Sequence, residues 1–531
     1  MNEIVDEFYD MVIIGGGATG SGIALDASSR DYKVLLIDKD DFASGSSSKS
    51  SKLIHGGVRY LEKAIKHFDK SQYNLVKEAL SERTIFLKNA PHLAKTLKLD
   101  TPIYKWLDIV YIYTGLLIYK LISGSKKIKD NEYINKTVLS LTQPSIKKEN
   151  LKGAISFHDG KFIDSRMVIA LLQTAEYYGL RARNYNEAKS FIYDKNQKVS
   201  GLKIYDKLEN KTYTVKSKCV INASGANVDN IRKIDDNSSD EIMDLSSGIH
   251  LVIDKKVIPY YEGLLIPKTS DGRVIFILPY LDHCLIGTTD NKVDYTTAKK
   301  ASEEEINYLI EHVNEYFDIK IQQKDILSSW SGIRPLLKQS VNKNTQDLVR
   351  EHQIQKSKNA LISIAGGKWT TYRKMAEELV DFTIENKYLS KNVKCKTKKL
   401  KVIGSQMNAK VVISLLDSYD LSKETKKSLI SFYGDRAIAI ANISKMKNYY
   451  ELIHKDLPFI HAEIVYAISN EYVKKPIDFL ARRISLCFIN KEKSLLCVDN
   501  ICNIMANILL WNKDKTEELK LETKEFIRNN F

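Results

Sequence analysis

A set of side chains suited to ligand binding lies near the N-terminus, in residues 52–60, which read KLIHGGVRY. The two glycines let the backbone approach a ligand closely, because no Cβ stands in the way. His55, Arg59 and Tyr60 surround the pair, a mixture that suits a planar cofactor on one side and an anionic substrate on the other. The strands, helices and turns around these residues are needed to decide which ligand they bind.

A dinucleotide-binding pattern precedes this run. Residues 10–14 form an apolar run typical of a buried parallel strand, and residues 15–20 then read GGGATG, which fits G-x-G-x-x-G. A helix is expected over about residues 21–30, followed by a strand over residues 33–37 that ends at Asp38. The order of strand, glycines, helix, strand and acid predicts a site for FAD or NAD.

Each member of the pattern has its own expected role. Gly15 makes the tight turn, Gly17 admits the diphosphate, and Gly20 lets the helix pack closely on the strand. The helix N-terminus would face the negative phosphates. Asp38 stands where a carboxylate binds the ribose.

A second glycine-rich turn lies far along the chain. Residues 360–365 predict a strand, and Gly366 and Gly367 then lead into a helix that begins near Trp369. A helix N-terminus at this place would stabilise the negative charge that a reduced flavin carries on its N1–C2=O edge. The turn is therefore a candidate contact of a flavin.

Together these segments resemble FAD-dependent glycerol-3-phosphate dehydrogenase of the aerobic, respiratory type. The likeness includes residues 46–62 and residues 366–373. Three further segments match in the family's order: residues 286–290 (IGTTD), 330–336 (WSGIRPL) and 478–483 (DFLARR). The clustered cysteines of the anaerobic, multi-subunit relative are missing, which favours the single-subunit respiratory form.

The resemblance implies that the cofactor is FAD. No motif for covalent attachment stands out, so we expect non-covalent binding. The implied contacts, in addition to Gly15, Gly17, Gly20 and Asp38, are Ser50, Ser51, His55, Gly56, Gly57, Gly225, Gly366, Gly367 and Thr370.

The resemblance also implies which residues bind and oxidise glycerol 3-phosphate. A phosphate needs fixed cations, and the planar fork of arginine matches it bidentately. His250 and Arg334 are the expected catalytic residues, with His250 as the base, while His55 is the rival base. Arg334 precedes a proline, which favours an extended segment. The implied substrate contacts are Arg59, Tyr60, Thr288, Thr289, Arg350 and Lys368.

The implied reaction is the oxidation of sn-glycerol 3-phosphate to dihydroxyacetone phosphate by hydride transfer to FAD, with the electrons passed to a membrane quinone. Two other enzymes fit the same residues: a glycerol-3-phosphate oxidase that uses oxygen, and an FAD-dependent amine or amino-acid oxidase of the same fold. A basic nucleic-acid-binding module is the non-enzyme alternative, and it predicts a colourless protein.

The composition is that of a globular protein of two or three domains, with 531 residues of which 43% are hydrophobic. Six cysteines are scattered without a C-x-x-C pair, so we expect reduced, buried thiols and no metal site. The formal net charge of +15 comes from dispersed lysines. This dispersal favours compositional drift, or weak attraction to an anionic membrane, over a nucleic-acid surface.

The sequence predicts a cytoplasmic protein that binds peripherally to the cytoplasmic face of the cell membrane. No signal peptide precedes the first strand, and no stretch reaches about 18 apolar residues. The most apolar segment, residues 109–119, has aromatic and basic edges that suit a membrane interface, with a core helix as the plainer alternative. A homodimer is one option for the oligomeric state.

The motif order predicts an α/β fold with a Rossmann-like FAD-binding domain, an antiparallel-sheet substrate domain (the cap) and a C-terminal helical domain. Residues 274–280 and 285–289 look like adjacent antiparallel strands of the cap. Leu480, Ile484 and Leu486 would give one apolar face to a C-terminal helix. The expected boundaries are 1–60, 151–235 and 345–385 for the FAD-binding domain, 61–150 and 236–344 for the cap, and 386–531 for the helical domain.

Overall fold

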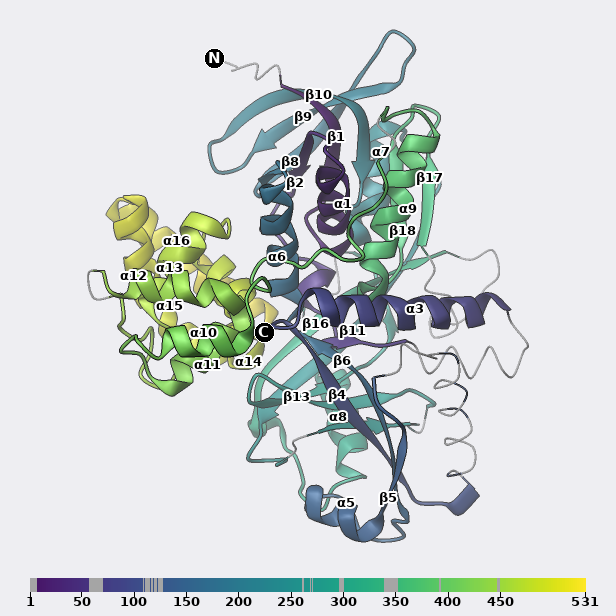
Figure 1. Cartoon of the computed structure of the whole chain (residues 1–531), viewed down its shortest axis with the longest axis vertical. Helices are drawn as coiled ribbons and strands as arrows, with labels where there is room; N and C mark the ends of the chain where they lie inside the picture. Colours follow the sequence, from purple (N-terminus) through teal and green to yellow (C-terminus); the bar gives the residue numbers. More distant parts are fainter. Residues whose placement is uncertain are drawn as a thin grey trace.

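The computed structural model contains two β-sheets, one above the other in Figure 1, with a group of C-terminal helices beside them. Gly57, Arg59, Tyr60 and Arg350 of the predicted site lie outside the residues that it describes, as does most of the segment 109–119. The described residues are 7–56, 70–107, 109, 115, 118, 122, 128–259, 262–267, 269, 271–295, 300–338, 352–390, 393–446 and 449–531.

The first sheet is mainly parallel and has the dinucleotide pattern at its centre, with the order β17-β18-β10-β1-β2-β7. β1 (Phe8–Ile14) pairs in parallel with β2 (Val34–Ile37) and with β10 (Lys211–Asn222). Met11, Val12 and Ile13 are all fully buried: Met11 and Ile13 pack among residues of the helices on one face, and Val12 packs mainly among residues of the antiparallel strands 186–193 and 199–206 on the other. The other strands are β7 (Arg181–Arg183), β8 (Asn186–Tyr193), β9 (Val199–Asp206), β17 (His352–Lys356) and β18 (Ile362–Gly366).

Helices pack on this sheet as its sequence predicts. α1 (Ala18–Ser29) follows the glycine pattern and contacts both α6 (Asp164–Tyr177) and α9 (Tyr372–Glu385). α7 (Val228–Asp235) follows β10. α3 (Lys70–Asn89) crosses the molecule between the two sheets (Figure 1). The predicted strand-to-helix turns at Gly15 and Gly366 are confirmed.

The second sheet has the order β15-β11-β14-β13-β12-β4-β6-β3, and β16 also pairs with β11. The two predicted antiparallel strands are confirmed as β13 (Ile275–Tyr280) and β14 (His283–Gly287). α8 (Glu303–Asn314) packs on β11 (Met243–Asp254). The remaining elements are β3 (Leu53–Ile54), β4 (Ala94–Ile103), β5 (Glu132–Asn135), β6 (Gly153–Phe162), β12 (Gly263–Ile266), β15 (Asn291–Lys292), β16 (Ile326–Leu337) and α5 (Lys136–Thr142).

One expected domain boundary needs correction. β6 was expected in the FAD-binding domain, which was to resume at residue 151, but it pairs with β4 along its whole length, from Gly153↔Ile103 to Phe162↔Ala94. β3 pairs with β6 and so also belongs to the second sheet. The backbone hydrogen bonds of these strands are made far along the chain, so the neighbouring motifs gave no sign of them.

The C-terminal domain is helical, as expected, but the helix predicted around Leu480 is broken. Residues Asp478–Arg483 form a π-helical turn, and Ser485, whose backbone is left-handed with a φ of 57°, separates this turn from the next short helix. Leu480, Ile484 and Leu486 are all buried, since the segment lies inside the core and has no solvent face. The helices are α10 (Ala409–Leu416), α11 (Lys423–Tyr433), α12 (Ala437–Ser444), α13 (His461–Asn470), α14 (Leu486–Ile489), α15 (Lys491–Leu509) and α16 (Lys513–Asn530).

The segment that joins the FAD-binding domain to the C-terminal helices is bound to the ends of α1 and α3. The Asn89 side chain donates to the Thr397 carbonyl at 3.0 Å, and the Val402 N–H donates to the Asn89 carbonyl at 3.0 Å. Arg30 Nη1 donates to the Val393 carbonyl at 3.2 Å. These contacts fix the path of the connection on both sides of residue 395.

The sequence predicts that the cysteines are reduced and buried. All six cysteines are free, and all but Cys395 are buried. Burial raises the pKa of the Cys219 thiol to about 12, which keeps it protonated and unreactive.

In the described part of the chain, no helix has the length and apolar character needed to cross a membrane.

Candidate active site

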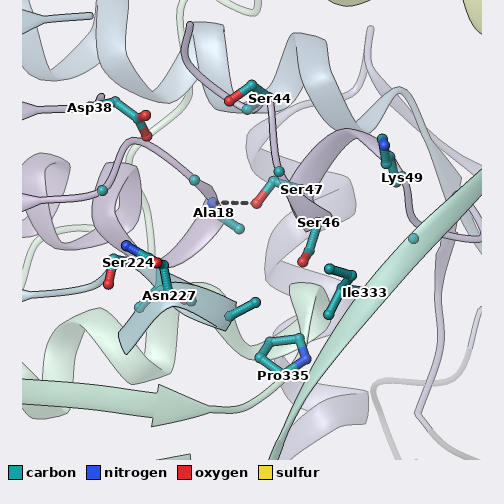
Figure 2. A pocket seen from close by; sticks show the side chains of 18 of the residues that line it. Ala18, Asp38, Ser44, Ser46, Ser47, Lys49, Ser224, Asn227, Ile333 and Pro335 are labelled. Atoms are coloured by element: carbon teal, nitrogen blue, oxygen red, sulfur yellow. Dashed lines mark hydrogen bonds between the residues drawn. The ribbon is translucent and has the colours of Figure 1, made fainter. Parts of the chain in front are cut away.

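A cavity of about 850 Å³ lies between the carboxyl ends of the parallel strands and β16 of the second sheet. Figure 2 shows Ala18 and Ser47 on one side of it and Ile333 and Pro335 of β16 on the other. The carboxyl end of a parallel sheet is the usual ligand site in such folds, and the volume is typical of a cofactor or substrate pocket. The C-terminal domain also lines it, through residues such as Arg482 and Asn530.

The first wall is formed by the glycine turn and the N-terminus of α1. Gly17 caps the helix without any side-chain hydrogen bond, and the Ala18 N–H donates to the Ser47 hydroxyl at 2.9 Å. A Cβ on Gly20 would lie 1.8 Å from the Gly15 carbonyl oxygen, so only glycine allows the helix to start this close to the strand. The positive end of the helix therefore points into the cavity, where it can bind phosphate.

Asp38 lies in the cavity at the end of β2, as predicted for the ribose contact. Its two oxygens accept hydrogen bonds from the Gly16 N–H at 2.7 Å and the Asp40 N–H at 2.9 Å. Burial raises its pKa to about 7. These bonds fix the carboxyl group, which can accept further hydrogen bonds from ribose hydroxyls.

The second glycine turn lines the same cavity on the side of the first sheet, beside the first glycine turn. Gly366, Gly367, Lys368 and Thr370 all line it. The short helical turn Trp369–Thr371 is bound to the N-terminal run, because Trp369 Nε1 donates to the Ser47 carbonyl at 3.0 Å and Thr370 Oγ1 to the His55 carbonyl at 3.3 Å. The structure thus brings together residues predicted from two distant motifs; Ser50, Ser51, His55 and Gly225 line the cavity as well.

Arg334 reaches the cavity from β16 of the second sheet. Its Nη2 donates to the Thr288 hydroxyl and the Thr289 carbonyl at 2.9 Å each, and its Nη1 donates to the Ser247 carbonyl at 3.0 Å and pairs with Asp290 at 3.4 Å. A Cβ on Gly248 would lie 2.1 Å from Nη2, so this glycine makes room for the guanidinium. The Arg334 side chain remains 18% exposed, so its fixed guanidinium is accessible to a ligand.

His250 lies in the cavity wall on β11 and is held by two neighbours. Its Nε2 is 2.8 Å from the Ser51 hydroxyl, and its ring stacks on Trp330 with the ring centroids 5.3 Å apart. Burial lowers the pKa of His250 well below its usual value, and the positive charges of Arg334 and Lys52 lower it further. The ring is therefore neutral near pH 7 and can accept a proton.

Several predicted contacts are placed differently from the expectation. Thr289 is buried outside the residues that line the cavity, and its hydroxyl donates to Glu305 at 2.7 Å and accepts from the Ile249 N–H at 3.0 Å. Thr288 contacts Arg334 and lies behind it. Ser50 lines the cavity, but its hydroxyl donates to Asp164 at 2.7 Å. Gly20 packs against Gly15, and Gly56 is also buried outside the residues that line the cavity.

Lys49 and Arg482 are among the cations at the cavity that sequence reasoning missed. The run IDFLARRISLCFI of residues 477–489 held a signal, because charged residues inside an apolar run must be buried with partners. It also missed Gly248, although a glycine inside a strand often marks a close approach.

Comparison with known proteins agrees with this geometry. The family model described as "FAD dependent oxidoreductase" matches residues 10–373, and the "C-terminal domain of alpha-glycerophosphate oxidase" matches residues 395–516. The chain therefore belongs to the FAD-dependent oxidoreductases, and FAD is its cofactor. When bound, FAD accepts the hydride.

Relatives place the chain within this class. The mitochondrial glycerol-3-phosphate dehydrogenase of Mesocricetus auratus is 40% identical over 97% of this chain and 73% of that protein. The human mitochondrial enzyme is 39% identical over 97% and 72%. A Bacillus halodurans glycerol-3-phosphate dehydrogenase solved with FAD is 29% identical, with a TM-score of 0.80 over 99% of this chain and 96% of that one. Among the FAD-dependent oxidoreductases, the chain belongs to the glycerol-3-phosphate dehydrogenase family.

Proposed function

We propose that this protein oxidises sn-glycerol 3-phosphate to dihydroxyacetone phosphate with FAD as the hydride acceptor and a membrane quinone as the next electron carrier. The observation that carries the proposal is the pairing of two different walls in one cavity. One wall carries the dinucleotide pattern, and the other presents the fixed guanidinium of Arg334 beside the neutral His250. A phosphate-bearing alcohol needs both a cation and a base.

Different side chains of the cavity bind the phosphate and accept the proton. Arg334, with Lys368 from the second glycine turn, binds the phosphate and fixes the substrate's position. His250 takes the proton of the C2 hydroxyl through its ring, which Ser51 and Trp330 hold in place. Arg59, Tyr60 and Arg350 remain predicted contacts, because they lie outside the described residues.

The variant Arg334→Lys tests the phosphate site. Lysine keeps the charge but loses the planar fork that contacts Thr288, Thr289 and Ser247. We expect kcat/KM for glycerol 3-phosphate to fall by about 100-fold, on the order of 3 kcal/mol, with the flavin content unchanged. Arg232→Lys, which alters an ion pair on α7, is the matched control and should have normal kinetics. A normal KM and kcat in Arg334→Lys would remove this residue from the site.

A substrate panel separates the proposal from an amine or amino-acid oxidase. Under anaerobic conditions, glycerol 3-phosphate should bleach the flavin absorbance at about 450 nm, whereas glycine and proline should not. Bleaching by an amino acid alone would reject the proposed substrate. A colourless preparation would reject the enzyme altogether.

The acceptor is tested by reoxidation of the reduced enzyme. Quinone should restore the yellow colour quickly and air only slowly, whereas rapid reoxidation in air with release of peroxide would identify a glycerol-3-phosphate oxidase. The same sample, run by sedimentation velocity, checks for a homodimer.

We also propose peripheral binding to the cytoplasmic face of the cell membrane, where the quinone is found. Trp106 and Leu107, which lead into the apolar segment 109–119, are 63% and 83% exposed. Such residues favour a membrane interface, and the net charge of +15 favours anionic lipid. The protein should sediment with anionic vesicles, and Leu107→Asn should weaken that binding while flavin reduction by glycerol 3-phosphate stays normal. Equal binding by the variant would move the contact elsewhere.

A further inference from the structure

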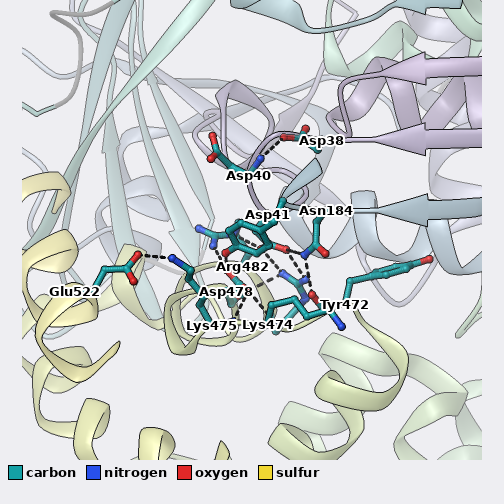
Figure 3. Close-up of polar contacts among 12 residues, drawn as sticks. Asp38, Asp40, Asp41, Asn184, Tyr472, Lys474, Lys475, Asp478, Arg482 and Glu522 are labelled. Carbon is teal, nitrogen blue, oxygen red and sulfur yellow. Dashed lines mark hydrogen bonds and ion pairs between the residues drawn. The ribbon is translucent and has the colours of Figure 1, made fainter. Parts of the chain in front are cut away.

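The C-terminal domain reaches the cavity through a buried ion network that the proposed reaction does not use (Figure 3). Asp41, on the loop after β2, accepts hydrogen bonds from both Arg482 and Arg483. Asp478 accepts from Arg482 Nη2 at 2.7 Å and from the Tyr185 hydroxyl at 2.6 Å. The side chains of both aspartates are fully buried. The network fixes the turn Asp478–Arg483 against the loop that borders the cavity.

The two arginines differ in what they leave unbonded. Arg483 uses every nitrogen: its guanidinium donates twice to Asp41, at 2.7 and 2.9 Å, and to the Glu471 carbonyl at 2.6 and 2.9 Å. Arg482 bonds through Nε and Nη2, but its Nη1 has no hydrogen-bond partner in the part of the chain that the structure describes. The side chain of Arg482 is 7% exposed and lines the cavity, so this donor is available to a ligand.

Lys49 supplies a second cation beside Arg482. It follows the short helical turn Ser46–Ser48 and lines the same cavity. Burial lowers the pKa of Lys49 to about 8, and repulsion by Arg482 contributes to the shift. The second cause means that the two cations lie close to each other.

No described carboxylate offsets the charge of Lys49. Its ammonium forms no ion pair with the described residues, and none of their acidic groups is among the causes of its pKa shift. Asp41 and Asp478 are matched by the two arginines, and Glu522, another acidic residue at the cavity, pairs with Lys475 at 2.6 Å. A desolvated cation without a counter-charge is costly unless an anion completes the site.

We propose that Lys49 and Arg482 bind a phosphate group in the cavity, so that the C-terminal domain completes the ligand site; the inference rests on the proposed function for its two phosphate-bearing ligands. Ser46 and Ser47 precede Lys49, and Ser47 contacts the N-terminus of α1, which attracts a dinucleotide's diphosphate. The diphosphate of FAD is therefore the expected ligand, and the phosphate of glycerol 3-phosphate is the other source.

The variant Lys49→Met tests the pair without disturbing the network, because Lys49 bonds to none of its members. We expect the dissociation constant of FAD, measured by the fluorescence released on dilution of the holoenzyme, to rise about tenfold. The variant also removes a desolvated charge that has no described counter-charge, so the melting temperature of the FAD-free protein should rise. If Lys49 had only a structural role, its replacement would lower both the melting temperature and the affinity for FAD.

Arg483→Lys is the matched control, because it loosens the same network behind the cavity. It should lower the melting temperature of the FAD-free protein and leave the FAD dissociation constant within about twofold of the original. If it weakens FAD as much as Lys49→Met does, domain docking explains the effect and the proposal is overturned.

ADP separates the two sources of phosphate, because it carries the diphosphate without the flavin. Weaker binding of both FAD and ADP to Lys49→Met assigns the pair to the diphosphate. Unchanged FAD and ADP binding with a raised KM for glycerol 3-phosphate assigns it to the substrate. No change in any of the three values overturns the proposal. The FAD and ADP titrations need no turnover, so they stay interpretable even if the proposed reaction is wrong.

Discussion

The two walls of the cavity present their binding groups by different means. The wall on the first sheet relies mainly on main-chain groups, since the N-terminus of α1 and the Gly366 turn both line the cavity, with the side chains of Asp38 and Lys368 added to them. The wall on the second sheet uses side chains, and each is held by its own partners: Arg334 by Thr288, and His250 by Ser51. Backbone groups suit a ligand that never changes, such as a cofactor. Side chains can be exchanged, so they can determine the substrate.

The largest expected effect comes from removing the base on the side-chain wall. His250→Gln keeps a polar group of similar size but cannot take up a proton. We expect kcat/KM to fall by roughly 100-fold or more, with unchanged FAD content, because general-base catalysis contributes about 10²–10⁴. Stopped-flow measurement of flavin reduction checks this step directly.

His312→Gln is the control for that variant. His312 is also buried, but it lies on α8 and contacts the Tyr308 carbonyl at 2.8 Å, outside the residues that line the cavity. Its variant should reduce the flavin at the normal rate. Equal loss in both variants would show that buried histidines matter here for stability alone.

A smaller effect is expected from the backbone wall. In Gly20→Ala, the new methyl group overlaps the Gly15 carbonyl, so α1 must shift away from the ligand. Overpacking of this kind costs about 1–3 kcal/mol, and we expect FAD affinity to fall about tenfold. FAD-saturated Gly20→Ala should keep its KM for glycerol 3-phosphate. A raised KM at full saturation would contradict the separation of the two walls.

The smallest effect is a change with pH. His250 acts as a base only when neutral, and burial, Arg334 and Lys52 hold its pKa well below 6.5. The kcat/KM of the FAD-saturated enzyme should therefore stay level from pH 8 down to 6.5 and decline only below it, as the ring gains a proton. In Arg334→Gln the decline should begin at a higher pH, because a positive charge has been removed. A decline centred above pH 6.5 in the unmodified enzyme would point to another base.

The same contrast explains what the sequence could predict. Gly15, Gly17, Gly20 and Asp38 lie close together along the chain, so their spacing alone predicted the turn, the helix and the acid. The side-chain wall depends on β11–β16 pairing, which places Arg334 opposite Ser246, and no local pattern predicts such a contact. Only the family resemblance pointed to those residues.

The differences between the expected and the observed placement of residues have physical causes of the same kind. Thr288 and Thr289 are neighbours of one type, and only the pairing of Thr289 with Ile249 shows that its hydroxyl is engaged. No sequence motif precedes β6, and its pairing partner β4 lies about 50 residues earlier in the chain. The network around Arg482 joins residues more than 400 positions apart in sequence, since Asp41 is its partner.

The bound connection between the first domain and the C-terminal helices determines how that network forms. Since Val393, Thr397 and Val402 are hydrogen-bonded to the ends of α1 and α3, the helices that follow are held close to the rest of the molecule. Their effective concentration at Asp41 is therefore set by the chain and is independent of how dilute the protein is. A protease cut in this connection would make the docking of the C-terminal helices bimolecular. The part of the cavity wall that they form would then be occupied only at sufficiently high protein concentration.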